Sequence, residues 1–442
     1  MPDQRHVIKR QILQLGVPRA QDAHTLSIEM SRVYRQRILP LINRYCTELS
    51  VPDRLHRIES LEVDLGTIDA QNMEEDIIAK LSPALREALA AQIHDQDHAD
   101  TSSDHTTHPR SQLELLACFV RTGSLPWWAD TSQPELIDAC LRDLSAHNPE
   151  VLSSLLRDVA REPRFLARIV HHVTADWLVE LVGLLSPRFT AALRQDTLPL
   201  VTLVQRCATA VDRRPTQLWH STWCHLLCVV GLGGQQYDTL QALYRAVLQR
   251  VAADAGITYD TLIAGIQRIV FMGDMEVRNE LKDLLDRLAR DRHDKPAVRH
   301  DADPQRSRGS TVLSSQEESL SDRFVGDPEE LYVDNAGLVV LWPFLSHFFG
   351  HVGLLEEKQF KDAAARQRAV GLLQYLATGD VSFPEYLLPL NKVLCGMEVT
   401  EVFDFGETLA EAETEECTNL LHAVIAQAPI LRDMSPTGFR GS

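Results

Sequence analysis

The chain has 442 residues, 44% of them hydrophobic and 24% charged, which is typical of a globular protein. Its formal net charge of −18 argues against nucleic-acid or anionic-membrane partners, because both require a basic surface. The longest uncharged apolar run, Ala336–Leu345, is too short to span a bilayer. The opening residues lack a signal-peptide pattern, so we expect a cytoplasmic protein with reduced thiols.

Residues 1–93 are predicted to form an N-terminal α+β module. Leu61, Val63 and Leu65 alternate with Glu62 and Asp64, which predicts a half-buried strand, although the acids also allow a carboxylate site. A helical pattern follows over Met73–Ile93.

Two polar segments are predicted to be linkers, over residues 94–112 and 293–328, because neither has enough large apolar side chains to form a core. The first is rich in histidine and aspartate, which are metal-ligand types. No rigid element would hold them in place, so we expect no metal site there. The linker histidines are His94, His98, His105 and His108.

Residues 113–292 are predicted to form a helical middle domain, because helical patterns alternate with proline and glycine breaks. Antiparallel helices with short loops satisfy this pattern, and so does a solenoid-like stack. Overall, the sequence predicts a mainly α protein of several helical globular domains, with a small strand element near the N-terminus.

Two features of this region have both a functional and a structural interpretation. The adjacent Trp127 and Trp128 can contact a partner protein or pack a loop onto the helices. His220, Cys224 and Cys228 recur at helical spacing, as zinc ligands can. Apolar residues surround them and no fourth ligand follows, so core packing is the favoured interpretation.

Residues 329–442 are predicted to form a C-terminal helical module. Leu331–Met397 is the densest apolar stretch, and Gly379 is expected to end a helix there. Its segment LLQYLATGDVSFPEY, which begins at Leu372, resembles LLACFVRTGSLPWW at Leu115, with Thr-Gly as the helix stop in both. The aromatic residues of this stretch are candidates for partner contacts: Tyr332, Trp342, Phe344 and Phe348.

No known catalytic signature appears in the sequence. The Gly-x-Ser-x-Gly, His-Glu-x-x-His, phosphate-loop and dinucleotide patterns are all missing. We therefore expect a protein that is not an enzyme, with no catalytic residues, cofactor or metal. A hydrolase is the enzyme class kept as an alternative.

Three signatures together resemble one family, the contractile injection system tape measure proteins of phage-tail-like particles. They are HRIESLEVDLGTI, TGSLPWW and the run from LYVDNAGL to LNKVLCGM. Leu431–Arg440 resembles only the start of the family's last element, so we expect the C-terminal module to be truncated.

The resemblance implies a structural part of a bacterial injection particle that sets the length of the inner tube or assembles tube and baseplate. Its implied partners are tube, baseplate or cap subunits, and it acts in the cytoplasm or within an extracellular particle. A scaffold or chaperone-like adaptor that leaves before maturation is the alternative. The 21 prolines and 21 glycines predict compact helical domains rather than one rod.

Overall fold

The computed structural model confirms a mainly α protein. It describes residues 6–16, 23–50, 56, 58, 60–69, 72–100, 107–131, 135–210, 213–233, 236–273, 277–290, 331, 333–404, 408–427 and 434–440. The chain divides into two compact units, Met1–Gln112 and Leu113–Ser442. None of the described helices is both long and apolar enough to cross a membrane.

The first unit is built from α1 (Ala23–Val33), α2 (Leu39–Leu49) and α3 (Met73–Asp100). A π-helical turn, Tyr34–Ile38, joins α1 to α2 just before Pro40, where a proline removes one backbone donor. Two small apolar clusters hold α1 and α2 against α3. Arg32, near the end of α1, and Arg37, in the π-helical turn, both donate to Glu74 on α3.

The strand predicted over residues 61–65 is not present in the structure, which describes this segment. Within 60–69 the structure assigns no strand, although Leu61, Val63 and Leu65 are half-buried and Glu62 and Asp64 are exposed, as the alternation requires. The apolar side chains pack into the two small clusters of the helices instead of joining a sheet. A strand is defined by its ladder of backbone hydrogen bonds, and periodicity alone does not supply a partner.

The first predicted linker is shorter in the structure than the sequence suggests. Helix α3 continues to Asp100, and α4 (Thr107–Thr122) begins six residues before the boundary between the two units. Polar side chains do not end a helix by themselves when the backbone can continue its hydrogen bonds. The second predicted linker lies outside the described residues, and the domain boundaries remain a prediction.

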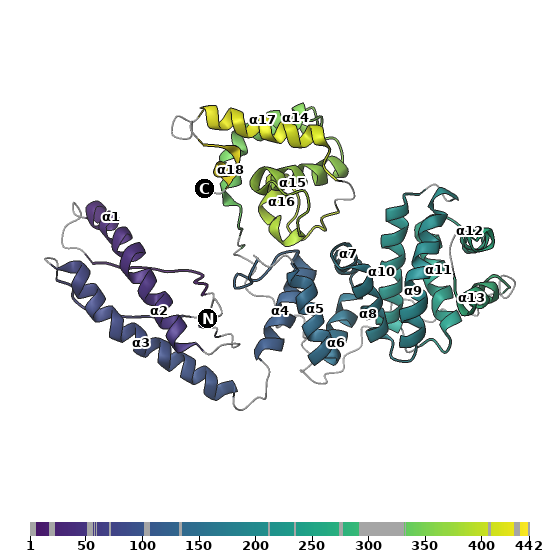
Figure 1. The fold of residues 1–442 in the computed structure, drawn as a ribbon, viewed down its shortest axis with the longest axis horizontal. Helices are drawn as coiled ribbons and strands as arrows, with labels where there is room; N and C mark the ends of the chain where they lie inside the picture. The colour runs from purple at the N-terminus through teal and green to yellow at the C-terminus, as the bar shows by residue number, and fades with distance from the viewer. Residues whose placement is uncertain are drawn as a thin grey trace, which may run out of the picture. The chain divides into compact units, whose positions relative to one another are not determined.

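The second unit begins with a bundle of helices that we call the middle helices, from the end of α4 to α13 (Figure 1). Their bounds are α5 Leu136–His147, α6 Pro149–Val159, α7 Pro163–His172, α8 Ala175–Leu185, α9 Thr190–Arg206, α10 Pro215–Gly233, α11 Leu240–Asp254, α12 Tyr259–Met272 and α13 Asn279–Arg290. A 3-10 turn, Cys207–Ala210, follows α9.

Helix α10 lies at the centre of the middle helices. It contacts α6, α7, α8, α9 and α11, and Trp223 on it is fully buried. At Gly231 a Cβ atom would lie 2.7 Å from the Cβ of Ala160, so this glycine lets α10 approach the end of α6 closely. In a solenoid each repeat contacts only its neighbours, so these contacts favour a bundle over the solenoid-like alternative.

The C-terminal module has its own apolar core. Its elements are the 3-10 helix η6 (Ala336–Leu341), α14 (Trp342–His351), β1 (Leu355–Glu356), β2 (Gln359–Phe360), α15 (Ala363–Thr378), the 3-10 turn η7 (Glu385–Leu387), α16 (Pro389–Leu394), α17 (Glu411–Gln427) and α18 (Pro436–Arg440). The two short strands pair antiparallel, with Leu355 opposite Phe360. Helix α15 is central and contacts α16, α17 and α18.

The two Thr-Gly sequences end their helices in the same way. Gly123 and Gly379 both have positive φ, +73° and +82°, and each donates its N–H to a carbonyl four residues earlier. Thr122 and Thr378 each donate a hydroxyl to a carbonyl one turn back and accept the N–H two residues ahead. The predicted helix stop is therefore present at both places.

The core of the C-terminal module yields a test of this packing. Replacing the fully buried Leu373 with alanine is expected to lower the free energy of unfolding by about 2–5 kcal/mol, because apolar contacts are lost and a cavity remains. Val393→Ala, at a side chain that is 54% exposed, is the matched control and should change it by less than about 0.5 kcal/mol. Equal effects in chemical denaturation would contradict this core.

Candidate functional site

Two sequence motifs that lie far apart in the chain meet at one buried carboxylate, that of Glu385. This residue begins η7 in the PEYLLPLNK motif, and its side chain is fully buried. Gly123, from TGSLPWW, lies so close that a Cβ atom there would be 2.5 Å from Glu385 Oε1. The neighbouring Tyr386 packs edge-on against Phe119 and belongs to the core of the middle helices. The C-terminal module is thus attached to the middle helices at this point.

Each oxygen of Glu385 accepts two hydrogen bonds. Arg168 Nε and His172 Nε2, both on α7, lie 3.1 and 2.8 Å from Oε2. Lys392 Nζ on α16 donates to Oε1 over 2.5 Å, and the backbone N–H of Phe403 donates to the same oxygen over 3.3 Å. Hydrogen bonds to an ionised group are stronger than neutral ones, so the carboxylate orders all three segments.

Two cationic side chains, Arg168 and Lys392, surround this single carboxylate, and backbone carbonyls accept their remaining hydrogen bonds. Arg168 donates to the carbonyls of Val120 and Thr400. Lys392 donates to the carbonyls of Val399 and Glu401. Buried ions stabilise a fold only when their hydrogen-bonding capacity is used, and here these donors reach the end of α4 and the loop after α16.

The charges around Glu385 outweigh the effect of its burial. Burial alone would raise its pKa, but the hydrogen bond from His172 and the charges of Lys392 and Arg168 lower the pKa to about 2. Burial lowers the pKa of Lys392, and the charge of Glu385 opposes that shift. A general acid or base works best with a pKa near the working pH, so this carboxylate suits a structural role rather than proton transfer.

A second polar network lies inside the C-terminal module and also uses motif residues. The amide of Asn335 donates to Asn391 Oδ1 over 2.7 Å and to Gln374 Oε1 over 3.0 Å. Asn391, which is fully buried, donates to Gln374 Oε1 and to the carbonyl of Val370. These hydrogen bonds fix η6, α15 and α16 against one another, and they leave Asn335 Oδ1 as a buried atom without a hydrogen-bond partner among the described residues.

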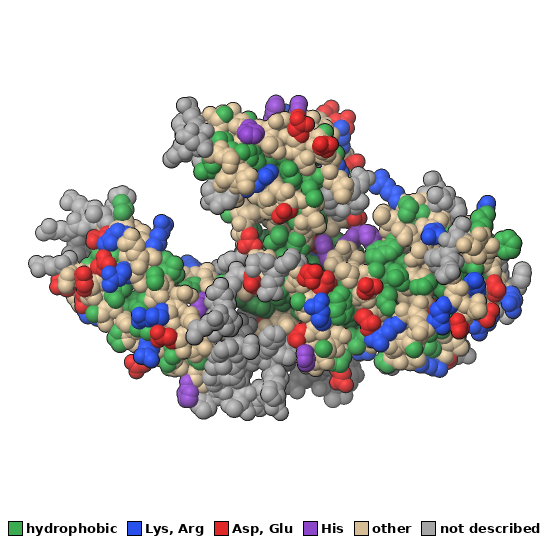
Figure 2. Space-filling model, in the orientation of Figure 1, with side chains coloured by type: hydrophobic (Ala, Val, Ile, Leu, Met, Phe, Trp, Pro, Cys, Tyr) green, Lys and Arg blue, Asp and Glu red, His purple; other side chains and the backbone are tan. Residues whose placement is uncertain are grey.

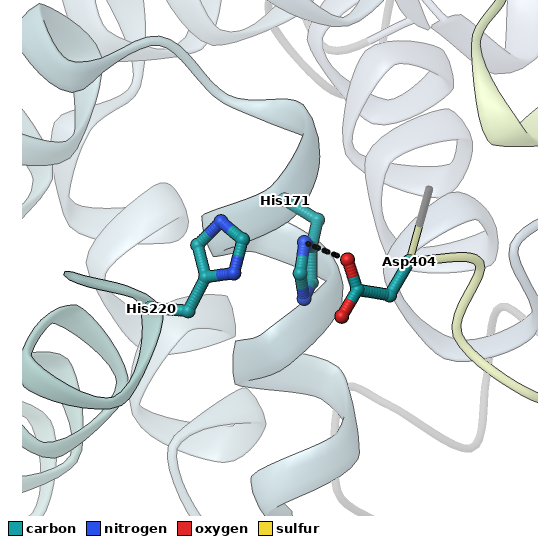
Figure 3. A group of neighbouring side chains, drawn as sticks. All are labelled: His171, His220 and Asp404. Atoms are coloured by element: carbon teal, nitrogen blue, oxygen red, sulfur yellow. Dashed lines mark ion pairs between the residues drawn. The ribbon is translucent and has the colours of Figure 1, made fainter. Parts of the chain in front are cut away.

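Beside the carboxylate lies a group of two histidines and one acid, His171 on α7, His220 on α10 and Asp404 in the loop after α16 (Figure 3). His171 lies between the other two (Figure 3). Its ring centroid is 3.9 Å from that of His220, and its Nδ1 is 3.7 Å from Asp404 Oδ1. Burial and the neighbouring His220 lower the pKa of His171 to about 4, and burial lowers that of His220.

The zinc interpretation of the α10 spacing is not supported by the surroundings of its cysteines. Burial raises the pKa of Cys224 to about 12, whereas a metal ligand must be a thiolate. Arg250 donates to the sulfur of Cys228. Within the described residues, His220 is the one of the three that lies in a group of possible ligands, and the other members come from α7 and the C-terminal module.

The aromatic residues predicted to contact partners have different surroundings. Trp128 is half-buried against the core of the middle helices, and Trp127 beside it is half-buried too. Trp342 is 58% exposed at the start of α14, whereas Phe344 packs partly against the module core. The structure thus leaves Trp342 as the most accessible of them.

Of the remaining two predicted contact residues, one is buried and the other lies outside the described residues. Phe348 is only 4% exposed, and its side chain packs inside the module core. Phe344 and Phe348 are one helical turn apart, so the sequence does not show which of the two is buried and which remains partly exposed. Tyr332 lies outside the described residues.

Sequence reasoning missed the ionic network because Arg168 and Glu385 are 217 residues apart. A signal was nevertheless present, since Arg168 and Lys392 each stand alone as a strong base in an apolar stretch, LARIV and LNKVL. A long charged residue at such a position is rarely buried unless it is paired. The partner could not be read from the sequence.

The family model for contractile injection system tape measure proteins matches residues 5–442. A search of curated proteins and a search of solved structures each found no significant match.

The contact between Gly123 and Glu385 can be tested with a matched glycine. Gly123→Ala is expected to lower the free energy of unfolding by about 1–3 kcal/mol more than Gly353→Ala, because the new methyl group displaces the carboxylate. Gly353 has nearly the same φ, +74°, and nothing lies within 4 Å of its Cβ position. Gly353→Ala therefore measures only the loss of stability that comes from placing alanine at a positive φ. Equal losses in urea denaturation would contradict the contact.

Acid should act on the fold through Glu385. The pKa in the folded state, about 2, lies below its ordinary value of 4.5, so the unfolded chain binds the proton more tightly. The resulting stability is complete above about pH 4.5 and is lost as the pH falls toward 2. Glu385→Gln should cost about 3–5 kcal/mol at neutral pH, and this difference should shrink with acid.

The control is Glu180→Gln, which removes a half-exposed carboxylate paired with Arg194. It should change stability by less than about 1 kcal/mol at any pH. A pH-independent difference between wild type and Glu385→Gln would mean that Glu385 is not held ionised.

Proposed function

The chain belongs to the contractile injection system tape measure protein family, and on this premise we propose that it is a non-catalytic assembly component. In this proposal it helps to build the inner tube on the baseplate or cap, and tube length depends on it through that step. Its partners are other particle proteins, which it meets in the bacterial cytoplasm.

The observation that carries the assembly role is the short length of the helices. The longest in the described residues, α3, has 28 residues and therefore spans about 42 Å. The other described helices are packed around apolar cores, so stretching the chain into a ruler would expose those cores to water. Folded modules that dock onto other subunits agree better with this architecture.

The exposed apolar residues of the C-terminal module support a docking role. Val339 and Val340 at the end of η6 are each 55% exposed, and Trp342 follows them at the start of α14. Figure 2 shows hydrophobic side chains on the visible face of this module, among acidic ones. Exposed tryptophan beside other apolar side chains is typical of protein interfaces.

Removal of the gene from its operon should abolish particles or change their tube lengths, as seen by electron microscopy. Trp342→Ser is expected to produce the same defect, because it removes the largest exposed apolar side chain of the proposed surface. Val381→Ser, at another exposed position of the same module, is the matched control and should assemble normally.

Particles of normal number and length after deletion would overturn the proposal. Mass spectrometry of purified particles distinguishes two versions of the proposed assembly role. A retained protein is a structural part, whereas an absent one, with deletion still preventing assembly, is an adaptor that leaves before maturation.

A further inference from the structure

We propose that His171, His220 and Asp404 bind a divalent transition-metal ion of the zinc type. The three side chains come from α7, α10 and the loop after α16, and one ligand atom of each lies within 4.8 Å of the other two. Two imidazole nitrogens and one carboxylate oxygen are ligand types that zinc prefers. Zinc sites with three protein ligands leave a fourth position for water or another group.

The distances require only a small closure around an ion. Bonds of about 2.0–2.2 Å in a tetrahedral site place ligand atoms about 3.3 Å apart, so ligand atoms must approach one another by up to roughly 1.5 Å. The backbone N–H of Asp404 donates to Gln367, but its side chain is 55% exposed, so a change of rotamer can bring the carboxylate toward the rings. That exposure also provides a route for the ion.

The chemical state of the rings suits a metal better than a proton. A zinc ligand must be a neutral imidazole, and the burial of both rings lowers their pKa and so favours that form over the charged one. Within the part of the chain that the structure describes, no hydrogen bond engages the ring nitrogens of either residue. Two largely buried imidazoles therefore have nitrogens available for a ligand.

The ion would strengthen the attachment of the C-terminal module to the middle helices. The segment before Asp404 already supplies the carbonyl of Thr400 to Arg168 and the N–H of Phe403 to Glu385. A metal would fix the same segment to α7 and α10 by coordination. Since a ligand that binds only the folded state stabilises it, zinc should raise the melting temperature.

The test uses the purified full chain after treatment with a chelator. Zinc is titrated by calorimetry, and cobalt(II) serves as the optical probe because its visible absorption reports the ligands. One ion per chain is expected, together with a higher melting temperature and a cobalt spectrum without thiolate charge transfer. Asp404→Asn and His220→Gln should each weaken zinc binding by about 10–100-fold or more.

Two control variants separate this site from other histidines. His347→Gln with His351→Gln removes a stacked pair on α14, and a second variant replaces His98, His105 and His108 with glutamine. Both should keep the tight site. Circular dichroism checks that each variant folds. Because the side chain of Asp404 is half-exposed, Asp404→Asn is the variant least expected to disturb folding. Failure of the wild-type chain to bind zinc or cobalt, or unchanged affinity in Asp404→Asn, would overturn the proposal.

Discussion

The carboxylate of Glu385 is the interaction on which the second unit depends most. It accepts hydrogen bonds from two residues of α7, from Lys392 on α16 and from the backbone of Phe403. The desolvation of such a group is costly unless every lone pair is used, so the four donors must be in place together. The network is therefore a joint between the middle helices and the C-terminal module, in which we expect the four hydrogen bonds to depend on one another.

The residues of this joint belong to the motifs on which the family resemblance rests. The glycine of TGSLPWW leaves room for the carboxylate of PEYLLPLNK, and the lysine of the latter neutralises it. The asparagines of LYVDNAG and LLPLNK, with the glutamine of GLLQYLATG, form the amide network behind it. Motifs of this kind mark internal packing rather than chemistry, which agrees with an assembly component.

The sequence predicted the local features well. Helix stops at Gly123 and Gly379, the helical patterns and the alternation over 61–65 depend on neighbouring residues only, and all are present in the structure. What depends on tertiary contacts could not be predicted. The alternating segment is not assigned as a strand. Phe348 is buried in the core of the C-terminal module, whereas Trp342 is exposed on its surface. Arg168 forms an ion pair with Glu385, although the two are 217 residues apart in the sequence. His171 and His220 meet for the same reason, because α7 packs on α10.

A double-mutant cycle between Arg168 and Glu385 tests the joint most directly. Arg168→Met, Glu385→Leu and the double variant are compared with wild type in urea denaturation. The account predicts that the double variant loses less stability than the sum of the single losses, by about 1–3 kcal/mol, because each single change strands a buried charge. Losses that add to within about 0.5 kcal/mol would show that the two side chains are not coupled and would contradict it.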